Sequence, residues 1–183
     1  MVKNSLAEDP AKTSPDDIEL RYPNADDGAA LQQLVAECPP LDRNSLYCNL
    51  LQCTHFGATS IAASADGRLL GFISGYLVPE TGALFIWQVA VAPAGRQRGL
   101  ALRMLRDLLA RPACAAVAFL HTTVNPDNVA SRALFAALAR ELDAPLHAEV
   151  WFERERHFGG AHPDEVLLKI GPFERARAVP VTQ

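Results

Sequence analysis

Apolar residues recur along this chain with two different spacings, and together these spacings predict a mixed α/β fold. Short runs in which apolar residues alternate or follow one another are typical of strands. Such runs lie at residues 18–22, 59–64, 69–78, 83–91, 115–124 and 166–170, and one further strand is expected near residues 147–151. Apolar positions three and four residues apart predict helices. Segments of this kind lie at residues 26–38, 45–53, 98–110 and 125–142.

Turn and cap residues separate these segments. Asp66-Gly67 predicts a hairpin turn between two of the strands. Asn125 is a suitable N-cap for the last helix, with Pro126 as its first residue. The nearly continuous apolar run 83–91 predicts a strand that is buried on both faces. The order of strands and helices is that of one mixed sheet with helices packed against it.

The chain has 183 residues, and we expect one folded domain over residues 18–173. Residues 1–17 are polar and include two prolines, which predicts a disordered N-terminal tail. Residues 174–183 predict a loose C-terminal tail. The N-terminal segment has no apolar stretch of the kind that a secretory signal needs, so we expect a cytoplasmic protein.

Composition narrows the class of protein. Apolar residues make up 49% and charged residues 21% of the chain, which is ordinary for a globular protein. The net charge of −4 gives no reason to expect a nucleic acid or a membrane surface as partner. No apolar run reaches the ~18 residues of a membrane helix. The four cysteines have the spacing of neither a zinc site nor a disulfide framework, and we expect buried or half-buried thiols.

The stretch RQRGLA, residues 96–101, carries the clearest candidate chemistry. It follows the apolar run 83–91 and opens the helix expected at 98–110. A helix N-terminus has unpaired N–H groups that favour an anion. Gly99 permits a close approach of the backbone, and the guanidinium groups of Arg96 and Arg98 suit phosphate oxygens. We interpret the stretch as a pyrophosphate cradle, although it has the spacing of neither a P-loop nor a dinucleotide-binding loop.

The pattern R-x-x-G-x-A after a strand resembles the signature of the GNAT acetyltransferase superfamily. The resemblance implies an acyl-CoA N-acyltransferase fold, with a mixed sheet of about six to seven strands flanked by about four helices. It implies acetyl-CoA as the acetyl donor and no metal. By this resemblance the donor is bound by the backbone of Val89 and Val91, by the loop residues Arg96, Gln97, Arg98, Gly99, Leu100 and Ala101, and by Asn128. Phe135 stands where many members have a tyrosine that protonates the departing thiolate.

Seven segments in the same order also resemble the diaminobutyrate acetyltransferases of ectoine synthesis. They are CPPLDRNSLY, CTHF, GFISGYL, FIWQVAVAP, TTVNPDNVASRALF, FGGAHPDE and KIGPF. This family acetylates the γ-amine of L-2,4-diaminobutyrate to give the N4-acetyl product. The resemblance implies that the diamino acid is bound by Asp42, Tyr47, Trp87, Thr122 and Glu165, and that His162 or Glu165 relays the proton. It also implies a homodimer.

These residue types suit a diamino acid. Its two ammonium groups call for carboxylates or aromatic faces. The reacting amine must be neutral, whereas an aliphatic amine has a pKa near ~10, so a base or a desolvating pocket is needed. Each candidate also has an ordinary structural alternative. Asp42 alone would suit an N-cap for the helix at 45–53, and a strand tryptophan such as Trp87 is commonly part of the core.

Two other functions remain open at this point. The same fold could acetylate another small diamine, a polyamine or a protein N-terminus, because Asp42 and Glu165 suit those amines too. A substrate carboxylate would need a cation, for which Arg43 and Arg154 are the candidates. The replacement of the usual tyrosine by Phe135 raises a third possibility, a module that binds acyl-CoA without turnover.

Overall fold

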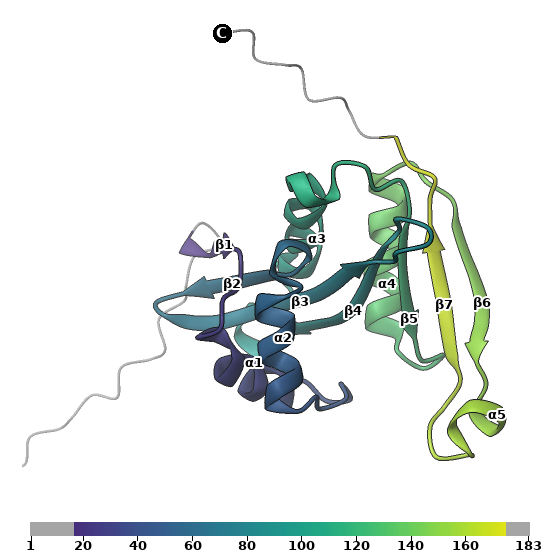
Figure 1. Cartoon of the computed structure of the whole chain (residues 1–183), viewed down its shortest axis with the longest axis horizontal. Coiled ribbons are helices and arrows are strands. Elements are labelled where there is room, and N and C mark those ends of the chain that lie inside the picture. The colour runs from purple at the N-terminus through teal and green to yellow at the C-terminus, as the bar shows by residue number, and fades with distance from the viewer. Residues whose placement is uncertain (1–16, 175–183) are drawn as a thin grey trace, which may run out of the picture.

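The computed structural model describes residues 17–174, which form a seven-stranded mixed sheet with helices on both faces (Figure 1). The strands are β1 (Glu19–Arg21), β2 (Ile61–Ala65), β3 (Arg68–Leu77), β4 (Leu84–Val91), β5 (Leu120–Val124), β6 (Leu146–Phe152) and β7 (Glu165–Ile170). Their order in the sheet is β1-β2-β3-β4-β5-β7-β6. The helices are α1 (Asp27–Ala36), α2 (Leu46–Thr54), α3 (Leu100–Ala110), α4 (Val129–Glu141) and α5 (Arg154–Phe158).

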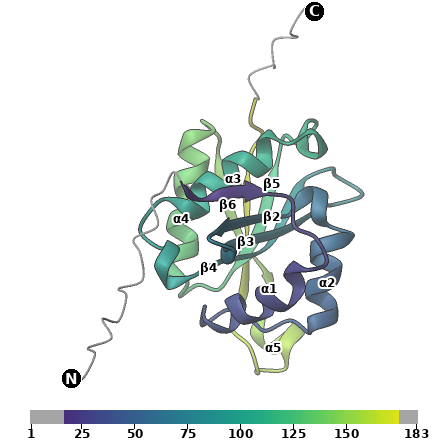
Figure 2. The same ribbon diagram turned by 90° about the vertical axis from the view of Figure 1, so that its left-hand side faces the viewer.

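Two apolar cores lie on opposite faces of this sheet. Leu31 of α1 and Cys53 of α2 pack with Phe72 of β3 on one face. On the other face, Leu105 of α3 and Leu138 of α4 belong to a larger core with strand residues from β2 to β7. Figure 2 shows α1 and α2 on one side of the strands and α3 on the other. The arrangement is the expected α/β architecture, since each helix buries its apolar stripe against the sheet.

The two central strands separate halfway along their length. β4 and β5 are parallel, and their pairing runs only from Leu84–Leu120 to Ile86–Thr122. Directly after this point β4 has a β-bulge, because Ile86 pairs with Gly75 and Gln88 with Ser74, which leaves Trp87 without a partner on β3. The expected burial on both faces therefore holds only for the first half of β4, and Trp87 is 45% exposed.

Several predicted boundaries were wrong, for local reasons. The strand expected at 115–124 begins at Leu120, because a 3-10 turn at Pro112–Cys114 and the bond from the Val117 N–H to the Cys114 carbonyl occupy the preceding residues. The helix expected at 125–142 begins at Val129. Its N-cap is Asn128, whose side-chain oxygen accepts from the Ser131 N–H at 3.0 Å. Asn125 is not the cap, because its carbonyl closes a turn with the Asn128 N–H.

Other predictions were confirmed. The further strand near residues 147–151 is β6. The five-residue α5 was not predicted, since it is too short for a helical repeat of apolar residues. Of the predicted tails, only Asp17 and Glu174 fall within the described residues.

The cysteines are free thiols, three of them buried and one half-buried, and burial raises the pKa of Cys53 to about 11. Among residues 17–174 no helix is long and apolar enough to cross a membrane.

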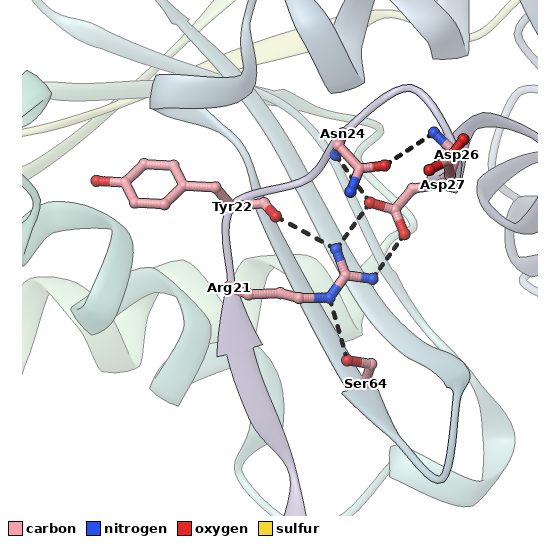
Figure 3. A network of polar contacts seen from close by, with 6 residues as sticks. All are labelled: Arg21, Tyr22, Asn24, Asp26, Asp27 and Ser64. Atoms are coloured by element: carbon pink, nitrogen blue, oxygen red, sulfur yellow. Dashed lines mark hydrogen bonds and ion pairs between the residues drawn. The ribbon is translucent and has the colours of Figure 1, made fainter.

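A partly buried ion pair joins the first strand to the first helix (Figure 3). The guanidinium of Arg21 donates to both carboxylate oxygens of Asp27, at 2.6 and 2.8 Å, and also to the hydroxyl of Ser64 on β2. The Asn24 N–H donates to the same carboxylate at 2.9 Å. The hydrogen bonds from Arg21 lower the pKa of Asp27, which is only 7% exposed. This network holds β1 against β2 and sets the start of α1.

We expect Arg21→Met to lower the free energy of unfolding by about 2 kcal/mol, because it leaves the Asp27 carboxylate buried without its cation. Urea unfolding followed by circular dichroism would measure this loss. Arg106→Met is the matched control, since it breaks an exposed ion pair with Glu141 and should cost much less. An equal loss in both variants would contradict a special role of the Arg21–Asp27 pair.

Candidate active site

A pocket of 310 Å³ opens where β4 has separated from β5, between the end of β4 and the starts of α3 and α4. Five of the residues expected to bind the donor line this pocket: Val89, Val91, Arg96, Ala101 and Asn128. Another part of the wall comes from the segment after α1, Cys38 to Leu41. The strand, the loop and the helix that the family resemblance linked to the donor therefore meet around one cavity.

The loop before α3 has a backbone that only certain residues adopt. Gly99 is the N-cap of α3 at φ 68°, and Gln97 has φ 59°, so both lie in the left-handed region. A Cβ at Gly99 would meet no protein atom within 4 Å, so the backbone conformation, not crowding by protein atoms, favours glycine there. The side chain of Leu100 is buried in the core, which leaves only its backbone for a ligand.

The carbonyl oxygen of Val91, in the wall of the pocket, accepts two hydrogen bonds. The Nε of Arg96 donates to it at 3.0 Å, and the thiol of Cys38 donates to it at 3.2 Å. Asn128 combines two roles, because its side chain caps α4 and it also lines the pocket. Its ordinary structural role and its expected contact with the donor are compatible.

Three of the expected acceptor residues form one cluster. Nε2 of His162 lies 3.7 Å from a carboxylate oxygen of Asp42 and 3.9 Å from one of Glu165. Nδ1 of the same ring lies 2.9 Å from the carbonyl oxygen of Pro163. Since a carbonyl oxygen only accepts, Nδ1–H is the donor in this contact, and Nε2 is the ring nitrogen that faces the two carboxylates.

Glu165 is the most buried member of the cluster, with a side chain that is 17% exposed. Burial raises the pKa of this carboxyl group. A hydrogen bond from the Thr123 hydroxyl and the nearby His162 oppose the rise, and Asp42 adds to it. A carboxyl group with a raised pKa beside an imidazole is a common arrangement for moving protons.

Asp42 is held by a residue that the sequence analysis missed. The side-chain amide of Gln88 donates to the Asp42 carbonyl at 2.9 Å and accepts from the amide of Asn44 at 3.4 Å. Gln88 directly follows the bulge on β4, so the strand that lines the pocket also fixes the acceptor loop, the segment between α1 and α2 that carries Asp42 and Asn44. Asp42 is not the cap of α2, because Ser45 accepts from the Cys48 N–H in that role. A polar residue inside an apolar strand was the available signal for Gln88.

The remaining candidates lie apart from this cluster or have other partners. Thr122 is buried, and its hydroxyl donates to the Ile86 carbonyl at 3.0 Å, which joins the central strands at their last pair. Tyr47, in the first turn of α2, is 70% exposed, and Trp87 lies at the bulge. Phe135 is 2% exposed within the core, so it replaces a tyrosine without offering any group that could protonate a thiolate.

Comparison with known proteins identifies the family of this chain. The model of the acetyltransferase (GNAT) family matches residues 29–139, from α1 to α4, and ends before His162 and Glu165. The L-2,4-diaminobutyric acid acetyltransferase of Methylotuvimicrobium alcaliphilum is 46% identical over 170 residues, which cover 92% of this chain and 99% of that protein. The enzyme of the same name from Bordetella parapertussis is 50% identical over 156 residues, covering 84% of each chain.

A solved structure extends the similarity to the whole fold. The diaminobutyrate acetyltransferase EctA of Paenibacillus lautus, in complex with its substrate L-2,4-diaminobutyric acid and coenzyme A, superposes with a TM-score of 0.82. It is 40% identical, and the match covers 86% of this chain and 96% of that one. On the evidence of its fold, its pocket and these similarities, the chain belongs to the acetyltransferase (GNAT) family and, within it, to the L-2,4-diaminobutyric acid acetyltransferases.

Proposed function

We propose that this chain transfers the acetyl group of acetyl-CoA to the γ-amine of L-2,4-diaminobutyrate, and so makes the N4-acetyl precursor of ectoine. The observation that carries the proposal is the position of the His162 cluster beside the donor pocket. Cys38 to Leu41 line that pocket, and the next residue, Asp42, faces His162. The His162 ring therefore lies next to Asp42, the residue that directly follows the wall of the donor pocket in the sequence.

On the donor side, the N-terminus of α3 and the guanidinium groups of Arg96 and Arg98 would bind the pyrophosphate. Val89 and Val91 would pair with the pantetheine arm, with the backbone of the loop residues Gln97, Gly99, Leu100 and Ala101 beside it and Asn128 on the far side. The shape of the pocket supports this assignment, because β4 has no strand partner on this side beyond Ile86 within the described residues.

On the acceptor side, Asp42 and Glu165 would bind the cationic diamino acid, and Tyr47 and Trp87 would border it. Thr122 would act through the strand junction that it closes, and Thr123 is the threonine whose hydroxyl faces Glu165. The neutral γ-amine attacks the thioester carbonyl, a C–N bond forms, and the C–S bond breaks. The N–H of Val89 would stabilise the oxyanion.

The proton that leaves the amine would pass to His162 or Glu165. Nε2 of His162 can accept it, and the resulting positive charge would lie 3.7 and 3.9 Å from two carboxylate oxygens. Such charge stabilisation favours transfer to the ring. Because Phe135 has no hydroxyl, water or another group would protonate the departing thiolate.

We also propose that the protein is a homodimer. β6 is an edge strand that pairs only with β7 within residues 17–174, and six of its seven residues are exposed. Leu146 and Val150 point to the same face of this strand and are 37% and 55% exposed. An exposed apolar edge of this kind favours pairing with a second copy. A cytoplasmic location and the absence of nucleic acid, membrane and metal partners stay predictions.

The proposed reaction is tested by following thiol release from acetyl-CoA with diaminobutyrate, ornithine, lysine, putrescine or no acceptor. We expect fast release with diaminobutyrate and an N4-acetyl product by NMR. Faster release with putrescine would leave the donor assignment intact and overturn the acceptor. Donor binding without release for any acceptor would instead favour a module that senses acyl-CoA.

We expect Glu165→Gln to lower kcat about 100-fold, the lower range for a lost acid–base group. Burial raises the pKa of Glu165. If Glu165 rather than His162 takes the proton, kcat of the wild type should fall as the pH drops through a value above the ordinary pKa of a glutamate, since only the carboxylate can accept a proton. This acidic limb should vanish in the variant. Glu141→Gln, at the far end of α4, should leave kcat and its pH profile unchanged.

For the oligomeric state, we expect Val150→Lys to convert a dimer into a monomer in analytical ultracentrifugation, because it puts a charge into the apolar edge. Leu77→Lys, at a comparably exposed end of β3, should remain dimeric. A monomeric wild type, or a dimeric Val150→Lys protein, would refute an interface along β6.

A further inference from the structure

The chain has two tryptophans, and each is the extra residue of a β-bulge. On β6, Val150 pairs with Val166 and Phe152 pairs with Glu165, so Trp151 is the extra residue between them. Trp87 occupies the corresponding position on β4. Bulges turn side chains away from the regular alternation and are frequent next to active sites. Trp151 is 42% exposed and was assigned no role by sequence.

The Trp151 ring lies on the same face of the sheet as Glu165. Strand register puts Phe85 beside His121. Thr123 is two residues further along β5 and therefore lies on the same face of the sheet as His121. Thr123 pairs with Leu167, and Glu165 lies two residues before Leu167 on the same face of β7. The opposite face of these strands carries the core under α4. Because Trp151 contacts Phe85, it lies on the face of Thr123 and Glu165.

The ring also reaches far across that face. Its centroid is 6.0 Å from that of Phe85 on β4, although β5 and β7 lie between β4 and β6 in the sheet. It is stacked on Phe152 at 4.4 Å, with 25° between the ring planes. Phe152 contacts Phe158, which in turn lies 4.7 Å from the His162 ring. A row of rings therefore extends from β4 to the proton-accepting histidine.

We propose that Trp151 is a specificity-determining wall of the acceptor site, whose indole face binds the α-ammonium group of the diamino acid. This rests on the proposed function. Only the γ-amine has to lose its proton, so the substrate keeps one cation while it reacts. A cation over an indole face is favourable, most of all where water is excluded. Stacking on Phe152 fixes the ring, so no ordering of a loose side chain opposes binding.

The kinetic test compares Trp151→Leu, Trp151→Phe and the wild type. We expect Trp151→Leu to raise KM for diaminobutyrate about tenfold, with kcat within about threefold and KM for acetyl-CoA unchanged, whereas Trp151→Phe keeps most of the affinity. Phe119→Leu is the matched control, because Phe119 is a similarly exposed ring at the other end of β5. A wild-type KM in Trp151→Leu would overturn the proposal.

A binding test does not depend on turnover. In Trp87→Phe protein, Trp151 is the remaining indole, and its fluorescence should change and saturate as diaminobutyrate is added. An unchanged signal, at concentrations that saturate the reaction, would overturn the proposal even if the variant's KM had risen. If the wild type acetylates putrescine and not diaminobutyrate, the proposed function fails, and the same titration with putrescine still decides whether Trp151 binds the second ammonium.

Discussion

The separation of β4 from β5 after the Ile86–Thr122 pair is the constraint on which the rest of the active site depends. Two parallel strands would ordinarily satisfy each other's backbone groups along their whole length. Here the bulge at Trp87 diverts β4, and the Thr122 hydroxyl ties the strands together at the last shared pair. The pocket follows from this divergence, because a strand without its neighbour can pair with a ligand. The same bulge also directs Gln88 toward the acceptor loop.

The two halves of the site are built around one short segment. The residues after α1 form a wall of the donor pocket and then present Asp42 to His162. Gln88 bonds this segment to the strand on the other side of the pocket. A change in the position of β4 is therefore passed to Asp42 through one hydrogen bond and to Asn44 through a second. Arg21 and Asp27 hold the opposite end of α1, so the helix that leads into the segment has a defined start.

The features that sequence predicted best are those with a local cause. The strands and long helices follow from the spacing of apolar residues, and Gly99 follows from a backbone conformation that favours glycine. The start of β5 and the cap of α4 were misplaced, because a proline turn and a neighbouring asparagine compete there with equally plausible signals. Other features depend on how the strands pair, which the local sequence does not reveal. Nothing local distinguishes Thr122 from Thr123, yet Thr122 joins β5 to β4 and Thr123 contacts Glu165.

His162 and Glu165, the residues proposed to take the proton, come from one arm of the structure that is continuous in sequence. β6, α5 and β7 are consecutive in the chain, and β6 pairs with β7. The pairing of β7 with β5, the contact of Trp151 with Phe85 and that of His162 with Asp42 join them to the rest. The donor-binding part is complete before this arm begins. If His162 and Glu165 act as proposed, replacing the residues of this arm that face the acceptor, while keeping its core residues such as Leu168 and Ile170, would alter which amine is accepted and leave the acyl carrier's site intact. Enzyme engineering and natural divergence can act on the two substrates separately for this reason.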